Sequence, residues 1–120
     1  MIKIRRERFG KYIQMKYQDK RGRKKMELLK WLEEWYQAEC NGDWEHCYGV
    51  RINTVDNPGW WVEIDIEDTS LREKEFETIR KNINDDNWMI CRTEDGKFIG
   101  DGDPSKLATI LQIFKDWVES

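Results

Sequence analysis

Apolar residues recur at helical spacing in the first clearly patterned part of the chain. One helical face follows the spacing i, i+3, i+4 and i+7 and contains Leu28, Trp31, Leu32 and Trp35. This spacing predicts an amphipathic helix that begins near Met26. The pair Asn41-Gly42 is a typical helix stop, so we expect the helix to end there.

The C-terminal part of the chain shows the same spacing. Its apolar face extends over three turns and contains Leu107, Ile110, Leu111, Phe114, Trp117 and Val118. Asp103 is suited to cap this helix, and Pro104 is suited to its first position. A second amphipathic helix is therefore predicted at the C-terminus.

Between these two helices the pattern changes to a period of two, which is typical of strands. One face contains Trp60, Val62, Ile64 and Ile66, and the other contains Trp61, Glu63, Asp65 and Glu67. Residues 48–55 also have strand character. The intervening residues 56–59 (DNPG) place Pro58 and Gly59 at the two centres of a turn, so an antiparallel hairpin is predicted.

The remaining elements complete a prediction of the fold. Residues 68–86 fit neither period, and we expect a loop through about Glu73 followed by a strand, with a short helix as the alternative. Residues 87–94 and 97–100 flank Asp95-Gly96, a strong hairpin signal. The sequence thus predicts an α+β fold: an antiparallel sheet of about four or five strands flanked by an N-terminal and a C-terminal amphipathic helix, with both helices on one face.

Charge divides the chain into two unequal parts. Residues 1–25 contain eleven Lys or Arg and two acidic residues, whereas the rest contains ten basic and twenty-two acidic residues. A chain of 120 residues is long enough for one core. We expect a single acidic domain at 26–120, preceded by a basic arm that is disordered, or untranslated if translation starts at Met26. Peptides from before Met26 in the native protein would contradict that start.

Composition also indicates the compartment and the class of partner. No apolar run reaches membrane-spanning length, the N-terminus lacks the apolar centre of a secretory signal, and three cysteines do not form a disulfide framework. We therefore expect a cytoplasmic protein with reduced thiols. An acidic body repels nucleic acid and favours a basic protein partner. Nucleic-acid binding through residues 1–25 is a weaker alternative that requires the arm to be translated.

The stretch NGDWEHCYGV, residues 41–50, holds the only histidine in the chain. Residue types that suit zinc occur at Cys40, His46, Cys47 and Cys91. The spacing argues against a zinc site, because adjacent strand residues point to opposite faces and no C-x-x-C or H-x-x-H pair is present. A small Cys/His-dependent or metal-dependent enzyme centred on Cys40 and His46 stays open as an alternative, with Asp43 or Glu45 orienting the imidazole.

Trp61 falls on the opposite side of its strand from the apolar residues. Either a further layer packs over that face, or a large aromatic side chain is exposed beside a row of acids. The second arrangement is typical of a protein-binding hot spot, in which aromatic anchors supply binding energy and charges steer a basic partner.

The run WLEEWYQAECNGDWEHCYGVRINTVDNPGWWVEIDIEDT, residues 31–69, resembles immunity protein 53, a family of bacterial polymorphic toxin systems. The resemblance rests on the patterns W-x-x-x-W-Y, C-x-G-D-W-E-H-x-Y-G, T-x-D-N-P-G-W and I-D-I, and it continues through Asp86-Asn87-Trp88 and the final helix. Asn41, Val55 and Trp61 depart from the residues expected there. The resemblance implies a small protein that binds and neutralises a cognate toxin domain, with no cofactor and no catalytic residue of its own.

With this resemblance, NGDWEHCYGV is expected to be a turn in which Gly42 ends the helix and Trp44 packs back on it. Its polar side chains would then lie at a rim, where loops on a rigid scaffold present contact residues. The residues expected to contact the toxin are Asp43, Glu45, His46, Trp61, Glu63, Asp65 and Glu67.

Overall fold

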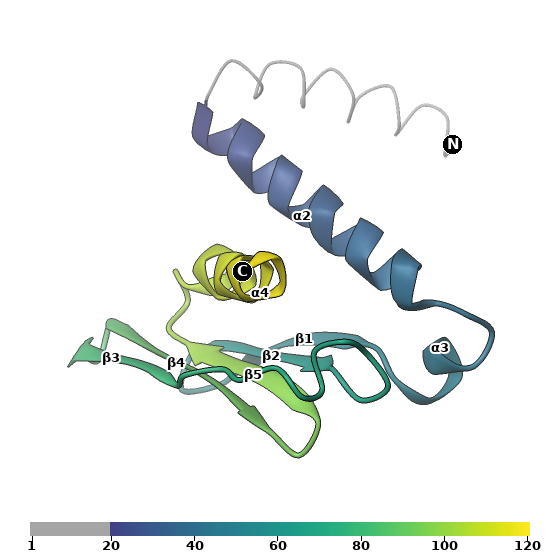
Figure 1. Cartoon of the computed structure of the whole chain (residues 1–120). Coiled ribbons are helices and arrows are strands. Elements are labelled where there is room, and N and C mark those ends of the chain that lie inside the picture. Colours follow the sequence, from purple (N-terminus) through teal and green to yellow (C-terminus); the bar gives the residue numbers. More distant parts are fainter. Residues whose placement is uncertain (1–19) are drawn as a thin grey trace.

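The computed structural model describes residues 20–120 and confirms the α+β fold (Figure 1). In chain order the elements are α2 (Lys20–Glu39), α3 (Trp44–Cys47), β1 (Val50–Val55), β2 (Gly59–Asp65), β3 (Ile79–Asn84), β4 (Asn87–Glu94), β5 (Lys97–Gly102) and α4 (Leu107–Glu119). The five strands form one antiparallel sheet in the order β1-β2-β5-β4-β3. Most of the predicted basic arm, residues 1–19, lies outside the described residues.

Both helices lie on the same side of the sheet, as predicted. Helix α4 rests directly on the strands, and α2 crosses above α4 (Figure 1). A Cβ atom at Gly100 of β5 would overlap the Ile110 side chain, so the missing side chain allows α4 to approach the sheet closely. Phe114 of α4 lies between the sheet and α2: it packs against Phe98 of β5 at 5.1 Å, and Trp31 and Trp35 of α2 pack edge-on to it with centroid distances of 6.0 and 5.0 Å. No helix of residues 20–120 is long and apolar enough to cross a membrane.

Residues 66–78, most of which lie in the segment whose periodicity was ambiguous, form a loop that packs against the core beside α4. Phe76 packs against Phe98 and Trp117, with ring centroids 5.5 and 5.2 Å away. The Lys74 ammonium donates hydrogen bonds to the carbonyl oxygens of Trp117 and Ser120, at 2.7 and 2.9 Å, which satisfies groups left unpaired at the C-terminus of α4. These contacts are tertiary, so they leave no periodic signal in the sequence.

The predicted loop and strand in this region are confirmed, and the alternative of a short helix is wrong. The strand β3 begins at Ile79, later than the predicted position just after Glu73. The predicted hairpin of β1 and β2 is also confirmed, but Gly59 is the first residue of β2, paired with Val55, and is not a central turn residue. A Cβ atom at Gly59 would overlap the carbonyl oxygen of Gly102 in β5, which explains a glycine at this strand position.

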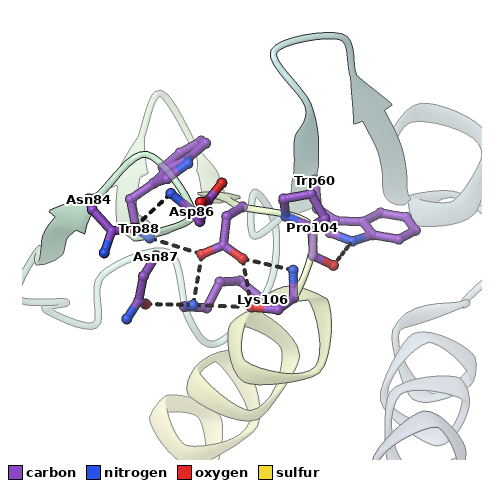
Figure 2. A network of polar contacts seen from close by, with 9 residues as sticks. Trp60, Asn84, Asp86, Asn87, Trp88, Pro104 and Lys106 are labelled. Atoms are coloured by element: carbon purple, nitrogen blue, oxygen red, sulfur yellow. Dashed lines mark hydrogen bonds and ion pairs between the residues drawn. The ribbon is translucent and has the colours of Figure 1, made fainter.

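Two predicted helix starts differ from the structure. Helix α2 begins at Lys20, before the predicted Met26, since the good helix formers Lys and Arg extend a helix once it is nucleated. Helix α4 begins at Leu107, and Asp103 does not cap it. The Asp103 carboxylate instead accepts a bond from the Ser105 backbone N–H at 2.8 Å, so it caps the turn before α4. Figure 2 shows the surrounding network, in which Lys106 and Trp88 converge.

Candidate functional site

The sheet face turned away from α4 is not covered by any element of residues 20–120 (Figure 1). We call this surface the open face. Alternate positions of the three central strands place on it Trp61, Glu63, Ile99, Asp101, Ile90 and Arg92. Within residues 20–120 no further layer packs over Trp61, and its side chain is half-buried and not fully exposed.

Trp61 is the centre of a compact cluster on the open face. Its indole N–H donates to Oε1 of Glu63 at 2.9 Å, and the Arg92 guanidinium lies 5.8 Å from its ring centroid, within cation–π range. Ile99 sits between Glu63 and Arg92 in the strand register and is only 6% exposed although it points away from the helices. We call these four residues the Trp61 cluster. Its half-buried tryptophan is held in one orientation before any partner binds.

Arg51 on the edge strand β1 neutralises two of the predicted contact acids. Its guanidinium makes a bidentate pair with Asp65 at 3.0 and 3.1 Å and also reaches Glu63 at 3.0 Å. Asp65 is 5% exposed and accepts a further bond from the Gly49 backbone N–H at 2.9 Å. The Trp61 N–H lowers the pKa of Glu63, and Arg51 adds to this effect against the opposing effect of partial burial. The Asp65 carboxylate raises the pKa of Arg51.

Arg51→Met is expected to lower the free energy of unfolding by about 1–3 kcal/mol, because it leaves the buried Asp65 carboxylate with only the Gly49 N–H as a partner. The matched control is Arg72→Met, which removes a pair with the much more exposed Glu67 and should cost less than about 1 kcal/mol. Urea unfolding at neutral pH measures both values. Equal losses in the two variants would show that burial does not distinguish these pairs.

The NGDWEHCYGV stretch contains a short capped helix, α3, where a turn was predicted. The Asn41 side chain accepts the Trp44 backbone N–H at 3.0 Å, and the Glu45 carboxylate accepts the backbone N–H groups of Asn41 and Gly42, both at 2.9 Å. Hydrogen bonds from backbone N–H groups lower the pKa of the Glu45 carboxyl, and the bond from the N–H of Glu45 itself has the largest effect. Trp44 packs back on α2, as predicted, edge-on to Trp35 at 6.0 Å.

Six of the seven predicted contact residues fall into two groups. Trp61 and Glu63 lie on the open face, whereas Asp43, Glu45, His46 and Glu67 lie around α3. Trp44 connects α3 to the end of β2, because its indole N–H donates to the Glu67 carbonyl oxygen at 2.9 Å. Asp43 and His46 are exposed, and Glu67 pairs with Arg72 at 3.1 Å. Asp65 lies between the two groups as a buried ion-pair partner.

The residues considered for thiol or metal chemistry are dispersed in environments of different kinds. The Cys40 thiol, at the end of α2, donates to the Tyr36 carbonyl oxygen at 3.3 Å, and Cys47 is exposed on α3. Burial in the sheet raises the pKa of Cys91 to about 12, which suits a packing role. Within the part of the chain that the structure describes, no group of three or more His, Cys, Asp or Glu side chains is arranged to hold a metal ion.

Reasoning from the sequence missed Arg92, Ile99 and Asp101 as residues of the open face. The strands of Arg92 and Ile99 were predicted, whereas Asp101 lies beyond the predicted end at Gly100, since β5 continues to Gly102. The alternation of Met89 and Cys91 with Ile90 and Arg92 would have separated the two faces of β4. The strand order was the missing information. Since β5 lies between β2 and β4 in the sheet, residues of the β1–β2 hairpin and of the β4–β5 hairpin meet on one surface.

Comparisons with known proteins identify the family. A family model described as immunity protein 53 matches residues 29–119 of the chain, which includes every strand, α3 and α4. Neither the curated proteins nor the solved structures contain a match to this chain. The matched range spans most of the sequence and agrees with the resemblance in its tryptophan-rich motifs. This chain therefore belongs to the immunity protein 53 family.

Proposed function

We propose that this protein binds a cognate bacterial toxin domain through its open face and neutralises the toxin by stoichiometric contact, without chemistry of its own. The carrying observation is the Trp61 cluster, which combines an oriented aromatic side chain with a shielded aliphatic one on a surface that no described helix covers. Such aromatic anchors ringed by charged groups supply most of the binding energy in protein interfaces.

Charge supports a basic partner. Residues 26–120 contain twenty-two acidic and ten basic side chains, so the folded body attracts a positively charged surface and accelerates encounter with it. Toxin domains that act on nucleic acid need such a surface to hold phosphates. In this proposal the exposed Asp43 and His46 and the half-buried Glu45 and Glu67 around α3 extend the contact, and Asp65 supports it by holding Arg51 in place.

The test is co-expression of the full chain with the C-terminal domain of the large protein encoded immediately upstream, followed by a pull-down and a growth assay. A one-to-one complex with restored growth is the expected result. Cys40→Ala is the control for the enzyme alternative, because a thiol-dependent enzyme would lose protection while a stoichiometric inhibitor would keep it. An active toxin that neither binds the chain nor is neutralised by it would overturn the proposal.

A further inference from the structure

A hollow of about 690 Å³ lies on the open face beside the Trp61 cluster. Its lining comes from the turn between β1 and β2 and from β3, β4 and β5, so it joins segments that are distant in the sequence. Asp101 of β5 and the apolar side chains of Trp88 and Ile90 of β4 contribute to this lining. The hollow therefore offers both apolar surface and a carboxylate to a partner.

Asp101 occupies a central position on the open face. In the strand register it lies between Trp61 of β2 and Ile90 of β4. Its side chain is half-buried, yet among residues 27–120 it has no hydrogen-bond donor and no cation within ion-pair distance. Burial raises the pKa of the Asp101 carboxyl, and the neighbouring Arg92 only partly opposes this effect. A carboxylate that is partly buried without gaining a partner is a cost to the isolated fold.

The cations near the hollow do not satisfy Asp101. Arg92 bonds to Glu94 at 3.3 Å and lies over the Trp61 ring. Arg80 lines the opposite wall on β3, two strands away from Asp101 in the register, which corresponds to about 10 Å. The lining on the β3 side also contains Lys81 and, in the turn to β4, Asp85, whereas β5 contributes Asp101 as its one lining residue, so the carboxylate available to an incoming cation away from the β3 cations is that of Asp101.

We propose that Asp101 receives the guanidinium group of an arginine of the toxin, while the rest of that side chain lies against Trp88 and Ile90. This inference rests on the proposed function, since it names the chemistry by which the open face recognises its partner. Arginine fits better than lysine, because its planar group pairs with a carboxylate through two parallel bonds and stacks on an indole ring. The acidic body supplies the long-range attraction, and Asp101 supplies the local selectivity.

The first test needs no toxin. N-acetyl-arginine amide is titrated into the ¹⁵N-labelled full chain, and the indole N–H signals of Trp88 and Trp61 are followed by NMR. We expect the Trp88 signal to shift in the wild type and in the matched control Asp116→Asn on α4, and at least fivefold less in Asp101→Asn. The neutral isostere N-acetyl-citrulline amide is expected to give the same small shift as the Asp101→Asn variant. Equal shifts in the wild type and Asp101→Asn, or no shift at all, would overturn the inference.

The second test uses the toxin complex. Asp101→Asn is expected to weaken binding at least tenfold without lowering the melting temperature, because the substitution removes a desolvated charge from the free protein. Full affinity in Asp101→Asn alongside a tight wild-type complex would overturn the inference and leave the proposed function intact. Absence of any wild-type complex would instead overturn the proposed function, while the arginine titration still decides whether Asp101 receives a guanidinium.

Discussion

Asp103→Ala is expected to lower the free energy of unfolding by about 3–5 kcal/mol, the range found when one partner of a buried ion pair is removed. Asp103 is 1% exposed, and its carboxylate accepts four hydrogen bonds (Figure 2). The donors are the Trp88 and Ser105 backbone N–H groups, the Ser105 hydroxyl and the Lys106 ammonium, at 2.9, 2.8, 2.6 and 2.7 Å. The variant would leave the Lys106 ammonium without its carboxylate and remove the side-chain bond to Trp88, so that the Asp103 backbone N–H, which donates to the Trp88 carbonyl oxygen at 3.1 Å, holds the turn to β4 with less support.

The control for Asp103 is Asp116→Ala on α4. Asp116 is exposed and accepts one bond, from Gln112 at 2.8 Å, so this variant should change stability by less than about 0.5 kcal/mol. Urea unfolding monitored by tryptophan fluorescence measures both proteins. A loss below about 1 kcal/mol in Asp103→Ala would show that water replaces the network at little cost.

The same carboxylate predicts a dependence on pH. Burial alone would raise the pKa of Asp103, but the bonds from Lys106, Ser105 and Trp88 outweigh it and hold the pKa well below its ordinary value. Because the folded pKa is depressed, the stabilisation is complete above the unfolded value of about 3.9 and is lost as the pH falls below it. The difference in stability between the wild type and Asp103→Asn should therefore be large at pH 7 and shrink below about pH 4.

Structure that depends on a local residue pattern was predicted from the sequence, whereas structure that depends on tertiary contacts, such as the turn held by Asp103, was not. The faces of β2 were predictable because the apolar Val62 and Ile64, which are fully buried under the helices, alternate with the acidic Glu63 and Asp65 on the open face. The edge strand β3 has no such pattern, since nearly all its side chains are exposed. The start of α4 was mispredicted because the turn before it is stabilised by a bond to Trp88 of a distant strand.

The candidate site was predictable only in part for the same reason. Trp61 attracted attention because a large apolar residue interrupts a row of acids, which is a local signal. The ion pairs that Arg51 makes with Glu63 and Asp65 depend on the β1–β2 register. The position of Asp101 on the open face depends on β5 lying between β2 and β4 in the sheet. Strand order and register are set by the whole fold. The acids Glu63, Asp65 and Glu67, which were predicted as a row of free contact residues, therefore turn out to be paired, the first two with Arg51 and the third with Arg72.

Trp61→Ala is expected to weaken the toxin complex by about 30- to 1,000-fold, which corresponds to roughly 2–4 kcal/mol for a central aromatic anchor. The loss has two parts: the indole surface itself, and the orientation that Trp61 gives to Glu63 and Arg92 through its N–H bond and its ring.

The matched control is Leu29→Ala, which removes a 45% exposed apolar side chain from α2, on the opposite side of the sheet. Titration calorimetry on both variants, after circular dichroism confirms that each is folded, should give a large loss for Trp61→Ala and less than a twofold change for Leu29→Ala. The reverse ranking would place the toxin on the helical side of the molecule. Because Trp61 lies on the open face and Leu29 lies on α2, on the helical side of the sheet, this comparison tests which of the two surfaces the partner occupies.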